Sequence, residues 1–439
     1  MAKQSVMPYT EEQKNYRDEI EKKHGKTPEQ LHDERARRIG DAMELREPDR
    51  VPAAFRLTYF PAKYLGIPKS TAYYQPGRWK HAVIRTILDF DPDQTSSFAG
   101  LTSGEVSQIL KPTMLRWPGG PLPENAPHQS IDVETMMGDE YDLIMNDPTD
   151  FVIRKQLPRM YEALAPLAKL PQLSDIARGF NMITTMFTSD EFKQLGGILI
   201  AAGEAQERFE KDMGTSFRED MQKLCLLSVD SMGGGGGIPF DNLSDVLRGM
   251  KSSMLDMYRH KDQMLALFDK QQESSFKRAL PADPNTGIHL RRVGAGMHRG
   301  TDGFLSKEQW ETFYWPYMKK SMLKSIELGY YPVPFVEGRL DSRLEYFLDL
   351  PKGKFGMMFE ATDIFRAKEI LGKHCCIMGN VPSSILQVGS VDDVETYCKK
   401  CIEICGKGGG YILMHGSSLD EAKPENVKAM IDSVKKFHP

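Results

Sequence analysis

Two patterns of apolar and polar positions divide the chain. Residues 10–46 read as two charged helices, "TEEQKNYRDEIEKKHG" and "TPEQLHDERARRIGDAMEL", the second with Thr27 as its N-cap before Pro28 at the first helical position. From "DRVPAAFRLTYF" onward, short apolar runs alternate with helical stretches, which is typical of βα units. The pattern predicts a helical extension over residues 1–46 and an α/β domain over residues 47–439.

The alternation is most regular in the second half of the chain. Amphipathic helices are predicted at 256–270 and 305–329, the latter with Ser306 as its N-cap. Strands, apolar throughout, are predicted within 196–205, 287–296, 331–338, 354–363, 374–381 and 409–418. Such strands indicate a parallel sheet covered by helices, either a (β/α)8 TIM-type barrel or a doubly wound sheet. Because no G-x-G-x-x-G follows an early strand, we favour the barrel.

The middle of the chain does not follow this alternation. Residues 84–160 contain Pro- and Gly-rich text such as "RWPGGPLPENAPHQS". We expect long loops or a small inserted region over one face of the barrel.

Composition narrows the function classes. The 439 residues are 40% apolar and 27% charged, with a net charge of -4. The mean hydropathy of -0.45 and the lack of an apolar run near 18 residues exclude a membrane span. Lysines and arginines are interspersed with acids, so nucleic acid is not an expected partner. The start "MAKQSVMPYTEEQ" has no apolar signal-peptide core, and we expect a cytoplasmic protein.

Six cysteines in such a chain indicate free thiols rather than disulfides. Cys398, Cys401 and Cys405 fall at i, i+3 and i+7 and could offer thiolates to a metal from one helix face. Burial of small apolar side chains against the core explains this spacing better, and we favour it.

Polar residues of catalytic or metal-ligand type follow several predicted strands. In a TIM-type barrel, functional residues lie at the carboxyl ends of the strands. Asp302 is the expected partner of His298 and Arg299, although a purely structural ion pair is an equal alternative. Glu360 and Glu337 could instead be N-caps of the following helices, but Asp341 is the more natural cap after Glu337. The set is His298, Arg299, Glu337, Glu360, Asn380 and His415.

Five consecutive glycines, 233–237, invite a phosphate-binding interpretation. No Lys-Ser/Thr follows them and no helix begins on them, which excludes a P-loop. A flexible substrate lid and an ordinary tight crossing both remain open.

The C-terminal sequence resembles that of the uroporphyrinogen decarboxylase superfamily. The resemblance rests on "GSVDDVETYCKKCIEICGKGGGYILMHGSS" with "PENVKAM", on "IMGNVPSSILQVGS", "LSKEQWETFYWPYMKKS" and "LRGMKSSMLDMYRHKDQMLALFDK", and on "REPDRVPAAF" near the front. It covers roughly residues 45–439, with 80–180 poorly matched. It implies a (β/α)8 barrel over 47–439.

Two branches of this superfamily lead to different expectations. Decarboxylases carry an Arg-rich entrance and an aspartate on the first barrel loop, but "VPAAFRLTYFPAKYLGIPKS" has only Arg56 and no Asp. The other branch, the cobalamin-dependent methyltransferases, holds zinc with a His-x-Cys pair and a later Cys. Here Phe335, Val336 and Glu337 occupy the pair's place, and His415 lies two residues before the later cysteine's place.

The resemblance to that branch implies a zinc site of Glu337, Glu360 and His415, with no metal as the alternative. Oxygen and nitrogen ligands make a harder metal than thiolates do, suited to polarising an ether oxygen. We therefore predict methyl removal from a small methylated substrate, favouring a methyl ether such as a methoxylated aromatic. Glu337, His298 and Arg299 are the predicted catalytic residues, and Tyr59, Phe335 and Asn380 the predicted substrate-binding residues.

The cobalamin is expected on a separate corrinoid protein, because the D-x-H-x-x-G signature is missing. Residues 84–160 or the N-terminal helices could dock that partner, although exposed charged helices are more often simply solvated. A homodimer is an open alternative. A cofactor-free lyase of the decarboxylase type and a non-catalytic barrel that docks a corrinoid protein are the alternative functions.

Overall fold

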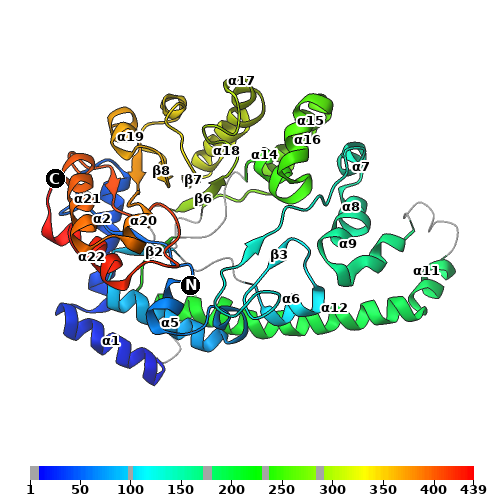
Figure 1. The fold of residues 1–439 in the computed structure, drawn as a ribbon, viewed down its shortest axis with the longest axis horizontal. Helices are drawn as coiled ribbons and strands as arrows, with labels where there is room; N and C mark the ends of the chain where they lie inside the picture. The colour runs from blue at the N-terminus through cyan, green and yellow to red at the C-terminus, as the bar shows by residue number, and fades with distance from the viewer. Residues whose placement is uncertain (1–8, 97–101, 172–179, 230–236, 283–290) are drawn as a thin grey trace, which may run out of the picture.

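Among the described residues, eight strands run parallel and follow one another in chain order around an open ring, in which β5 and β6 are not paired (Figure 1). The computed structural model describes residues 9–96, 102–171, 180–229, 237–282 and 291–439. Five strands form one sheet, in the order β10-β9-β8-β7-β6, and three form another, β1-β2-β5. The strands are β1 (Ala54–Phe55), β2 (Gln94–Ser96), β5 (Ser228–Val229), β6 (Arg292–Met297), β7 (Tyr331–Val336), β8 (Gly356–Phe359), β9 (Cys376–Met378) and β10 (Tyr411–Ile412).

The two sheets meet where β1 lies beside β10. The backbone N–H of Ala54 donates to the carbonyl of Leu413, and that of Leu413 donates to the carbonyl of Pro52, both at 2.9 Å. The predicted α/β fold with a parallel sheet is therefore confirmed. Within the described ranges no ladder joins β5 to β6, so a fully closed barrel stays a prediction.

The inner face of the ring has its own apolar core. Tyr331 and Val333 of β7 lie in one buried cluster with Cys376, Met378, Ile412 and Met414 of β9 and β10. Alternate residues of the same strands belong to a second cluster with the outer helices. Because side chains alternate across a strand, the first set marks the lumen and the second the outer surface. The lumen is thus a packed core, as in TIM-type barrels.

The N-terminal extension covers one end of this lumen. The helices α1 (Glu11–His24) and α2 (Pro28–Met43) form as predicted, and Thr27 caps α2 through a capping box. Ile39, Ala42 and Met43 of α2 pack into the lumen cluster, and the hydroxyl of Tyr331, at the start of β7, donates to the carbonyl of Met43 at 2.7 Å. The helix α2 therefore packs at the amino-terminal end of the strands.

Helices cover the outer face of the sheets, and several confirm the sequence prediction. Ser306 caps the stretch that begins at α17. One predicted helix, 256–270, is two helices that break at His260. The covering helices are α3 (Phe60–Leu65), α4 (Thr71–Tyr74), α5 (Pro76–Phe90), α14 (Pro239–Asn242), α15 (Gly249–Arg259), α16 (Lys261–Arg278), α17 (Lys307–Gln309), α18 (Trp315–Glu327), α19 (Ile364–Leu371), α20 (Ser383–Val388), α21 (Val391–Cys405) and α22 (Pro424–Lys436), with the shorter turns η4 (Leu243–Leu247), η5 (Trp310–Tyr314) and η6 (Leu344–Asp349).

The insertion after β2 is larger and more helical than expected. Residues 84–90 belong to α5 and 94–96 to β2, whereas described helices of the insertion run from residue 104 to 223. The prediction of a loop region over 84–160 is therefore wrong in its limits, although a hairpin with a long loop does occur at β3–β4. The elements are α6 (Gly104–Leu110), β3 (Leu115–Arg116), β4 (Gln129–Ser130), α7 (Tyr141–Asn146), α8 (Pro148–Phe151), η1 (Val152–Gln156), α9 (Leu157–Met160), η2 (Glu162–Lys169), α11 (Phe180–Phe187), α12 (Asp190–Phe209), η3 (Glu210–Ser216) and α13 (Phe217–Lys223).

The predicted strand at 196–205 is also wrong, because these residues lie inside α12. Ser189 caps this helix, and Phe192, Leu195, Ala202, Ala205 and Phe209 recur at helical spacing and are buried. A short apolar run cannot by its periodicity be assigned to strand or helix, and here the neighbouring residues decide.

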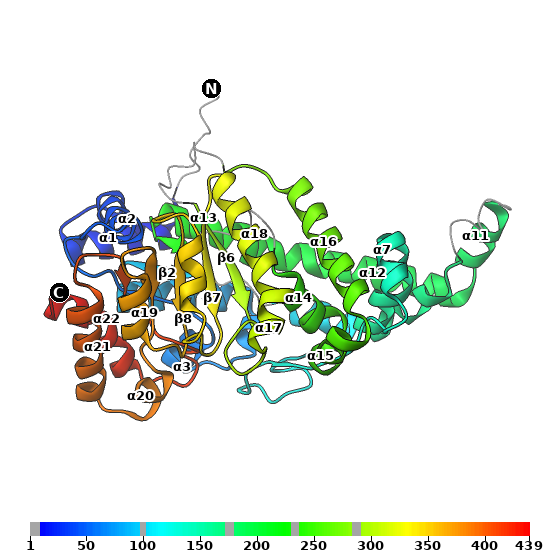
Figure 2. The ribbon, with the colours of Figure 1, turned by 90° about the horizontal axis from the view of Figure 1, so that it is seen from above.

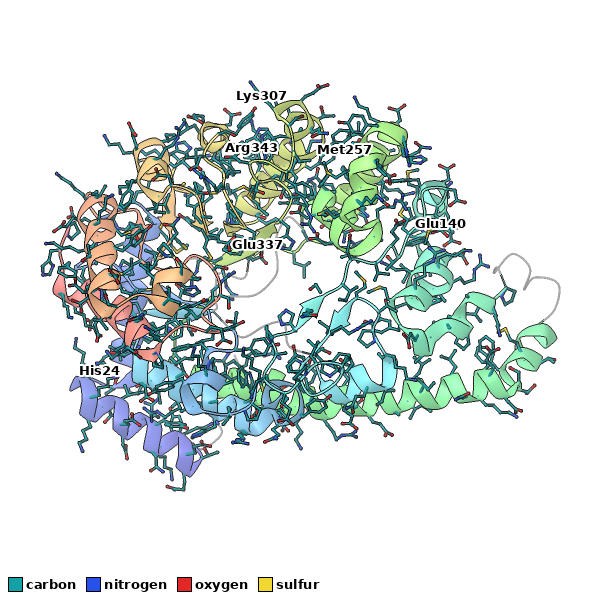
Figure 3. The ribbon with its side chains drawn as sticks, in the orientation of Figure 1. His24, Glu140, Met257, Lys307, Glu337 and Arg343 are labelled. Atoms are coloured by element: carbon teal, nitrogen blue, oxygen red, sulfur yellow. The ribbon has the colours of Figure 1, made fainter. Side chains whose placement is uncertain are left out.

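The insertion reaches away from the ring of strands. Figures 1 and 2 both place α11 at the far end of the molecule, whereas α1 and α2 lie at the other end beside α21 and α22. In Figure 3, His24 of the extension and Glu140 of the insertion lie on opposite sides of the ring of strands. No described helix is long and apolar enough to cross a membrane.

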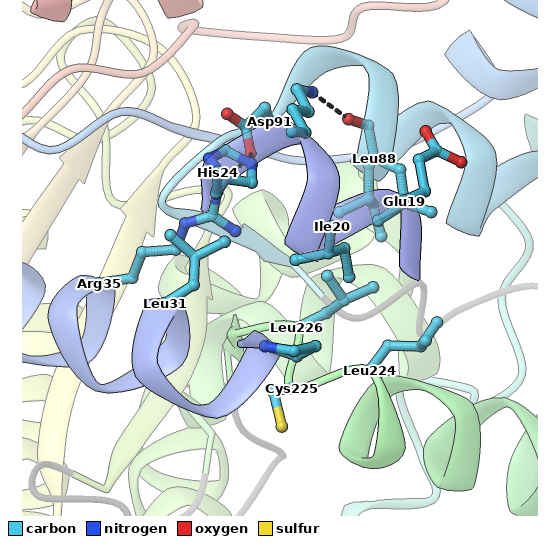
Figure 4. A pocket seen from close by; sticks show the side chains of 13 residues that line it. Glu19, Ile20, His24, Leu31, Arg35, Leu88, Asp91, Leu224, Cys225 and Leu226 are labelled. Carbon is cyan, nitrogen blue, oxygen red and sulfur yellow. Dashed lines mark hydrogen bonds and ion pairs between the residues drawn. The ribbon is translucent and has the colours of Figure 1, made fainter. Parts of the chain in front are cut away.

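Charged and apolar contacts attach the extension to the domain. Arg35 and His24 both pair with the buried Asp91 that ends α5, the latter at 3.2 Å, and Figure 4 shows the three side chains together. Beside them Ile20 and Leu226 belong to the outer core cluster. The extension thus shares buried contacts with the domain.

The cysteines follow the interpretation that we favoured. All six are free, and all but Cys225 are buried. Cys398, Cys401 and Cys405 face the outer core cluster from α21. Their burial raises the pKa of each thiol, which keeps them neutral.

Candidate active site

The register of the strands forms one ring of side chains below the predicted site. Successive pairings between neighbouring strands link Gly296 of β6, Phe335 of β7, Met358 of β8, Met378 of β9 and Ile412 of β10. Paired residues point to the same face of a sheet, so these five form one layer inside the lumen.

The next layer toward the carboxyl ends holds four of the predicted residues. His298, Glu337, Glu360 and Asn380 each lie two positions beyond a member of the first layer. The backbone N–H of Glu337 donates to Met297, and that of Glu360 to Val336, both at 3.2 Å, so the ladder continues to this level. Figure 3 shows Glu337 on the inner side of the ring of elements.

His298 lies between two carboxylates. Its Nδ1 is 2.5 Å from Oδ2 of Asp245, and its Nε2 is 3.8 Å from Oε2 of Glu337. The hydrogen bond with Asp245 raises the pKa of His298 to about 9, with Glu337 adding to the effect and burial opposing it. The imidazole is therefore a cation at neutral pH, with Nε2 toward Glu337 and over Gly296.

Asp245 also binds Arg299, which fixes both predicted cations of this loop. Arg299 places a guanidinium nitrogen 2.9 Å from Oδ1 of Asp245 and donates from Nε to Ser244 Oγ at 3.2 Å. Burial acts against ionisation of Asp245, but the hydrogen bond from His298 lowers its pKa overall.

A second aspartate, Asp241, holds the backbone of the same loop. Its carboxylate accepts the N–H of His298 at 3.2 Å, the N–H of Arg299 at 3.0 Å and the hydroxyl of Tyr314 at 2.7 Å. Burial raises the pKa of Asp241 to about 6. Three donors converge on one buried carboxylate and so fix the orientation of the loop.

The predicted partner of His298 and Arg299 is wrong. Asp302 accepts from the backbone N–H and the hydroxyl of Ser342, at 3.0 and 2.6 Å, and lies 3.7 Å from Arg343. The sequence did contain a signal for the actual partners, because Asp241 and Asp245 are four residues apart, the spacing of one helix face.

Arg56 and Phe335 form the wall beside the two glutamates. The guanidinium of Arg56 lies 3.8 Å from the centre of the Phe335 ring, a cation–π contact. Burial lowers the pKa of Arg56, whereas the charges of Glu337 and Glu360 favour its cation. Phe335, a predicted substrate-binding residue, is partly exposed here.

His415 does not lie in this layer. It is fully buried, its Nε2 accepts the backbone N–H of Arg56 at 2.8 Å, and its Nδ1–H donates to the carbonyl of Ser417. Burial lowers its pKa to about 3, so the ring is neutral. His415 connects the loop after β10 to the strand β1.

These contacts bear on the predicted zinc site. Both ring nitrogens of His415 are already engaged, so neither faces Glu337 and Glu360 as a ligand. No group of three or more His, Cys, Asp or Glu side chains among the described residues is arranged to hold a metal ion. Glu337, Glu360 and His415 as placed do not fit zinc, and zinc at this position stays a prediction.

The other two predicted substrate-binding residues hold loops together. The hydroxyl of Tyr59 lies 2.7 Å from that of Tyr73 and 3.0 Å from Nδ1 of His128. Asn380 donates to the carbonyl of Thr362 at 2.6 Å and accepts from Tyr397 at 3.1 Å. Both side chains are buried. The glycine run at 233–237 lies outside the described residues except for Gly237, so its predicted role as a lid or a tight crossing is not addressed.

Comparisons with known proteins show what this chain resembles. Residues 229–437 match the family described as "Uroporphyrinogen decarboxylase (URO-D)". Over these residues the chain is similar to the uroporphyrinogen decarboxylase family. A curated uroporphyrinogen decarboxylase from Syntrophotalea carbinolica is 24% identical over 207 residues, 46% of this chain and 58% of that protein. The chain thus matches little more than half the length of that relative.

A solved structure extends the comparison over almost the whole chain. A methyltransferase from Methanosarcina mazei superposes with a TM-score of 0.53 and 14% identity, over 91% of this chain and 97% of that chain. At this identity the likeness shows the fold alone. The family match includes Asp241, Asp245, His298 and Glu337 but not Arg56, so the candidate site joins the family region to the N-terminal part.

Proposed function

We propose that this chain is a methyltransferase. It moves a methyl group from a small methylated substrate, with a methyl ether such as a methoxylated aromatic favoured, to the corrinoid of a separate protein. The observation that carries the proposal is His298, held by Asp245 with its Nε2 toward Glu337 at the barrel mouth. The fold shared with the Methanosarcina mazei methyltransferase supports it.

The chemistry requires an acid at this position. An ether loses its methyl group only if the C–O bond breaks, and the oxygen leaves more easily when it takes up a proton. Nε2 of His298 donates that proton, so the ether becomes an alcohol or phenol and its methyl carbon passes to the acceptor. A corrinoid, when a partner protein presents it, supplies the nucleophile that accepts the methyl group.

Each neighbour of His298 has a separate task. Asp245 keeps Nδ1 engaged, so that Nε2 carries the transferable proton. Glu337 is half-exposed and faces that nitrogen at 3.8 Å, where its charge favours the protonated ring, and solvent replaces the proton that the ring gives up. No step of this mechanism passes through a metal, because the predicted ligands do not fit one.

The alternatives keep specific support. The curated relative is named as a uroporphyrinogen decarboxylase, which favours a cofactor-free lyase, but residues 51–70 carry Arg56 without an aspartate. A non-catalytic barrel that docks a corrinoid protein is the third candidate. Release of carbon dioxide from a uroporphyrinogen would support the lyase, and no turnover of either substrate would support docking.

The decisive experiment is methyl transfer from a methoxybenzoate to cob(I)alamin, followed by the absorbance of the corrinoid. Replacing a general acid slows a reaction by about 100-fold or more, which we expect for His298→Gln. His438→Gln, an exposed histidine next to the last residue, is the matched control and should transfer methyl at the natural rate. Natural rates in His298→Gln would refute the assigned acid.

The predicted metal needs its own test. Elemental analysis of the natural protein, Glu337→Ala and His415→Ala measures zinc per chain. One zinc per chain that disappears in both variants would restore the metal site and require His415 to leave its present hydrogen bonds. Zinc that is absent, or unchanged in both variants, agrees with the geometry.

A further inference from the structure

The 20-residue helix α12 of the insertion packs on the chain through one face only. The buried side chains of this helix lie on a single side, and the opposite side is open to solvent. Figure 1 shows α12 along one edge of the molecule. Residues of the open side recur every three or four positions, which places them on one face of the helix. This outer face of α12 consists of Lys193, Gly196, Gly197, Ile200, Gly203, Glu204 and Glu207.

The centre of the outer face is apolar. Ile200 is 66% exposed, and the adjacent Leu199 is 47% exposed. A Cβ on Gly197 or on Gly203, to either side of Ile200, would meet nothing within 4 Å. A large apolar side chain in water is unfavourable, and glycine inside a helix is destabilising. A second backbone that approached this face closely would use the room at the glycines and bury Ile200.

The two ends of the outer face carry opposite charges at equal distances from Ile200. Lys193 lies seven residues before Ile200, and Glu207 lies seven residues after it. The side chain of Lys193 is 63% exposed and is 3.8 Å from Asp190, a loose ion pair on the same helix. Glu207 is exposed as well. A rotation by half a turn about Ile200 therefore exchanges a positive end with a negative end.

We propose that two copies of this chain associate through the outer face of α12, with the two helices antiparallel and a two-fold axis at Ile200. In such an interface, residues at equal distances from the axis face one another. Ile200 meets Ile200 of the second copy, Gly197 meets Gly203, and Lys193 meets Glu207. The inference does not depend on the proposed methyl transfer.

The charges favour the antiparallel arrangement over the parallel one. In a parallel pair, Lys193 would face Lys193 of the second copy and Glu207 would face Glu207, and like charges repel. In the antiparallel pair, an ion pair forms at each end instead. Exposed ion pairs add little affinity, but they set the orientation of paired helices. The affinity is expected to come from the apolar centre, where the glycines let the two backbones approach.

The size of this interface predicts a weak dimer. A helix of 20 residues is about 30 Å long. One pair of such helices falls at the low end of specific interfaces, below about 1,200 Å² of buried surface. We therefore expect a dissociation constant in the micromolar range, which sedimentation velocity at increasing concentrations of the full chain measures.

A cysteine at the two-fold axis tests the geometry. In Ile200→Cys the two thiols of a dimer lie at the axis, and mild oxidation should link them, since a disulfide needs Cβ atoms within about 4.5 Å. The background is Cys225→Ser, because Cys225 is the one cysteine that is not buried. Val388→Cys in the same background is the matched control. Val388 is 80% exposed at the end of α20, outside the proposed interface, and should give no linked dimer.

Charge reversal tests the orientation of the helices. Lys193→Glu and Glu207→Lys each turn two attractive pairs into two repulsive ones, and each should weaken association by about tenfold. The double variant exchanges the signs and restores attraction, so its association should return to the natural value. A merely structural role of either side chain would not produce this recovery.

Filling the room at the glycines tests the close approach. Gly197→Leu should abolish the dimer, although leucine favours a helix more than glycine does and should not lower the temperature of unfolding. Gly77→Leu is the matched control, because Gly77 is an exposed position of α5 where a Cβ also meets nothing within 4 Å. Its association should stay natural.

The outcomes separate this inference from the proposed function. A chain that stays monomeric at every concentration would overturn the dimer. A dimer that persists unchanged in Lys193→Glu and Gly197→Leu would use another face and would also overturn it, as would equal linking of Ile200→Cys and Val388→Cys. Methyl transfer to free cob(I)alamin should be natural in every variant, and its absence from all of them would refute the methyltransferase without affecting the dimer.

Discussion

His415 offers the sharpest test of the structure, because the sequence predicts a metal ligand and the geometry shows a buried connection between strands. We consider the substitution His415→Ala. It removes the acceptor of the Arg56 N–H and the donor to the Ser417 carbonyl, both at a site with no solvent exposure. The barrel contact between the end of β10 and β1 loses two hydrogen bonds.

The expected cost follows from those two groups. A buried backbone group left without a partner costs about 1–3 kcal/mol. With one donor and one acceptor affected, we expect His415→Ala to lower the free energy of unfolding by about 3 kcal/mol. His374→Ala is the matched control, because His374 is only partly buried and makes one hydrogen bond, from Nε2 to the Leu350 carbonyl at 2.7 Å. It should cost about 1 kcal/mol.

The cost also depends on pH in a direction that the structure fixes. Burial lowers the pKa of His415 to about 3 from an ordinary 6.5, so below pH 6.5 the unfolded chain binds a proton that the folded chain does not. The stability that the neutral ring contributes is complete above pH 6.5 and declines by about 1.4 kcal/mol per pH unit as pH falls toward 3. His415→Ala removes this dependence.

Equilibrium urea unfolding at pH 7.0 and pH 5.5 measures both effects. The difference in unfolding free energy between the natural protein and His415→Ala should narrow by about 1 kcal/mol at the lower pH. An unchanged difference would show that His415 is not a buried neutral ring. A variant as stable as the natural protein that has lost a bound metal would show that the sequence prediction was right.

Three further predictions concern other parts of the molecule. Asp245→Asn should lower kcat by about tenfold or more, because His298 loses the carboxylate that orients its ring; an unchanged pH profile and rate in the methyl-transfer assay would contradict this. Arg38→Met should lower the free energy of unfolding by about 3 kcal/mol, since the buried Asp93 loses a partner at 2.6 Å; urea unfolding checks it, and natural stability would show that the pair contributes nothing. Titration with a disulfide reagent should modify Cys225 first in the native protein, and fast reaction of more than one thiol would contradict the burial of the other five.

The fold was predictable where local signals agree with tertiary structure. The strands β7 to β10 are apolar runs in the sequence because both of their faces are buried. Ser306 marks the start of its helix because it forms a capping box there. The prediction of a strand at 196–205 failed because Leu199 and Ile200 have the side chains typical of strands but lie exposed on α12. Only the neighbouring capping and helical spacing distinguish the two cases.

The pairing of the candidate acid with Asp245 was missed for a different reason, because the spacing of Asp241 and Asp245 indicates a shared helix face but not what that face meets. Asp245 lies 53 residues before His298, and the two meet only because η4 packs beside the end of β6. Asp302 was predicted as the partner because it is close to His298 in sequence. In the structure it instead accepts a hydrogen bond from Ser342 of the next loop. Proximity along the chain is a poor guide to ion pairs wherever loops from several strands share one rim.

The difference between His298 and His415 follows from the parity of strand positions. Along β7, Tyr331, Val333 and Phe335 face the lumen. Glu337 lies two positions beyond Phe335 and therefore faces the same side. Along β10, Ile412 and Met414 face the lumen, which leaves His415 with the outward parity of Leu413.

A set of Glu337, Glu360 and His415 therefore combines two inward positions with one outward position. Strand continuity would have to break before the three could converge on a single ion, since a shift of one residue reverses the face of every side chain. The same parity, applied to β6, puts Gly294, Gly296 and His298 on one inner line. The inward direction of the candidate acid is thus a consequence of the same alternation that turns His415 outward.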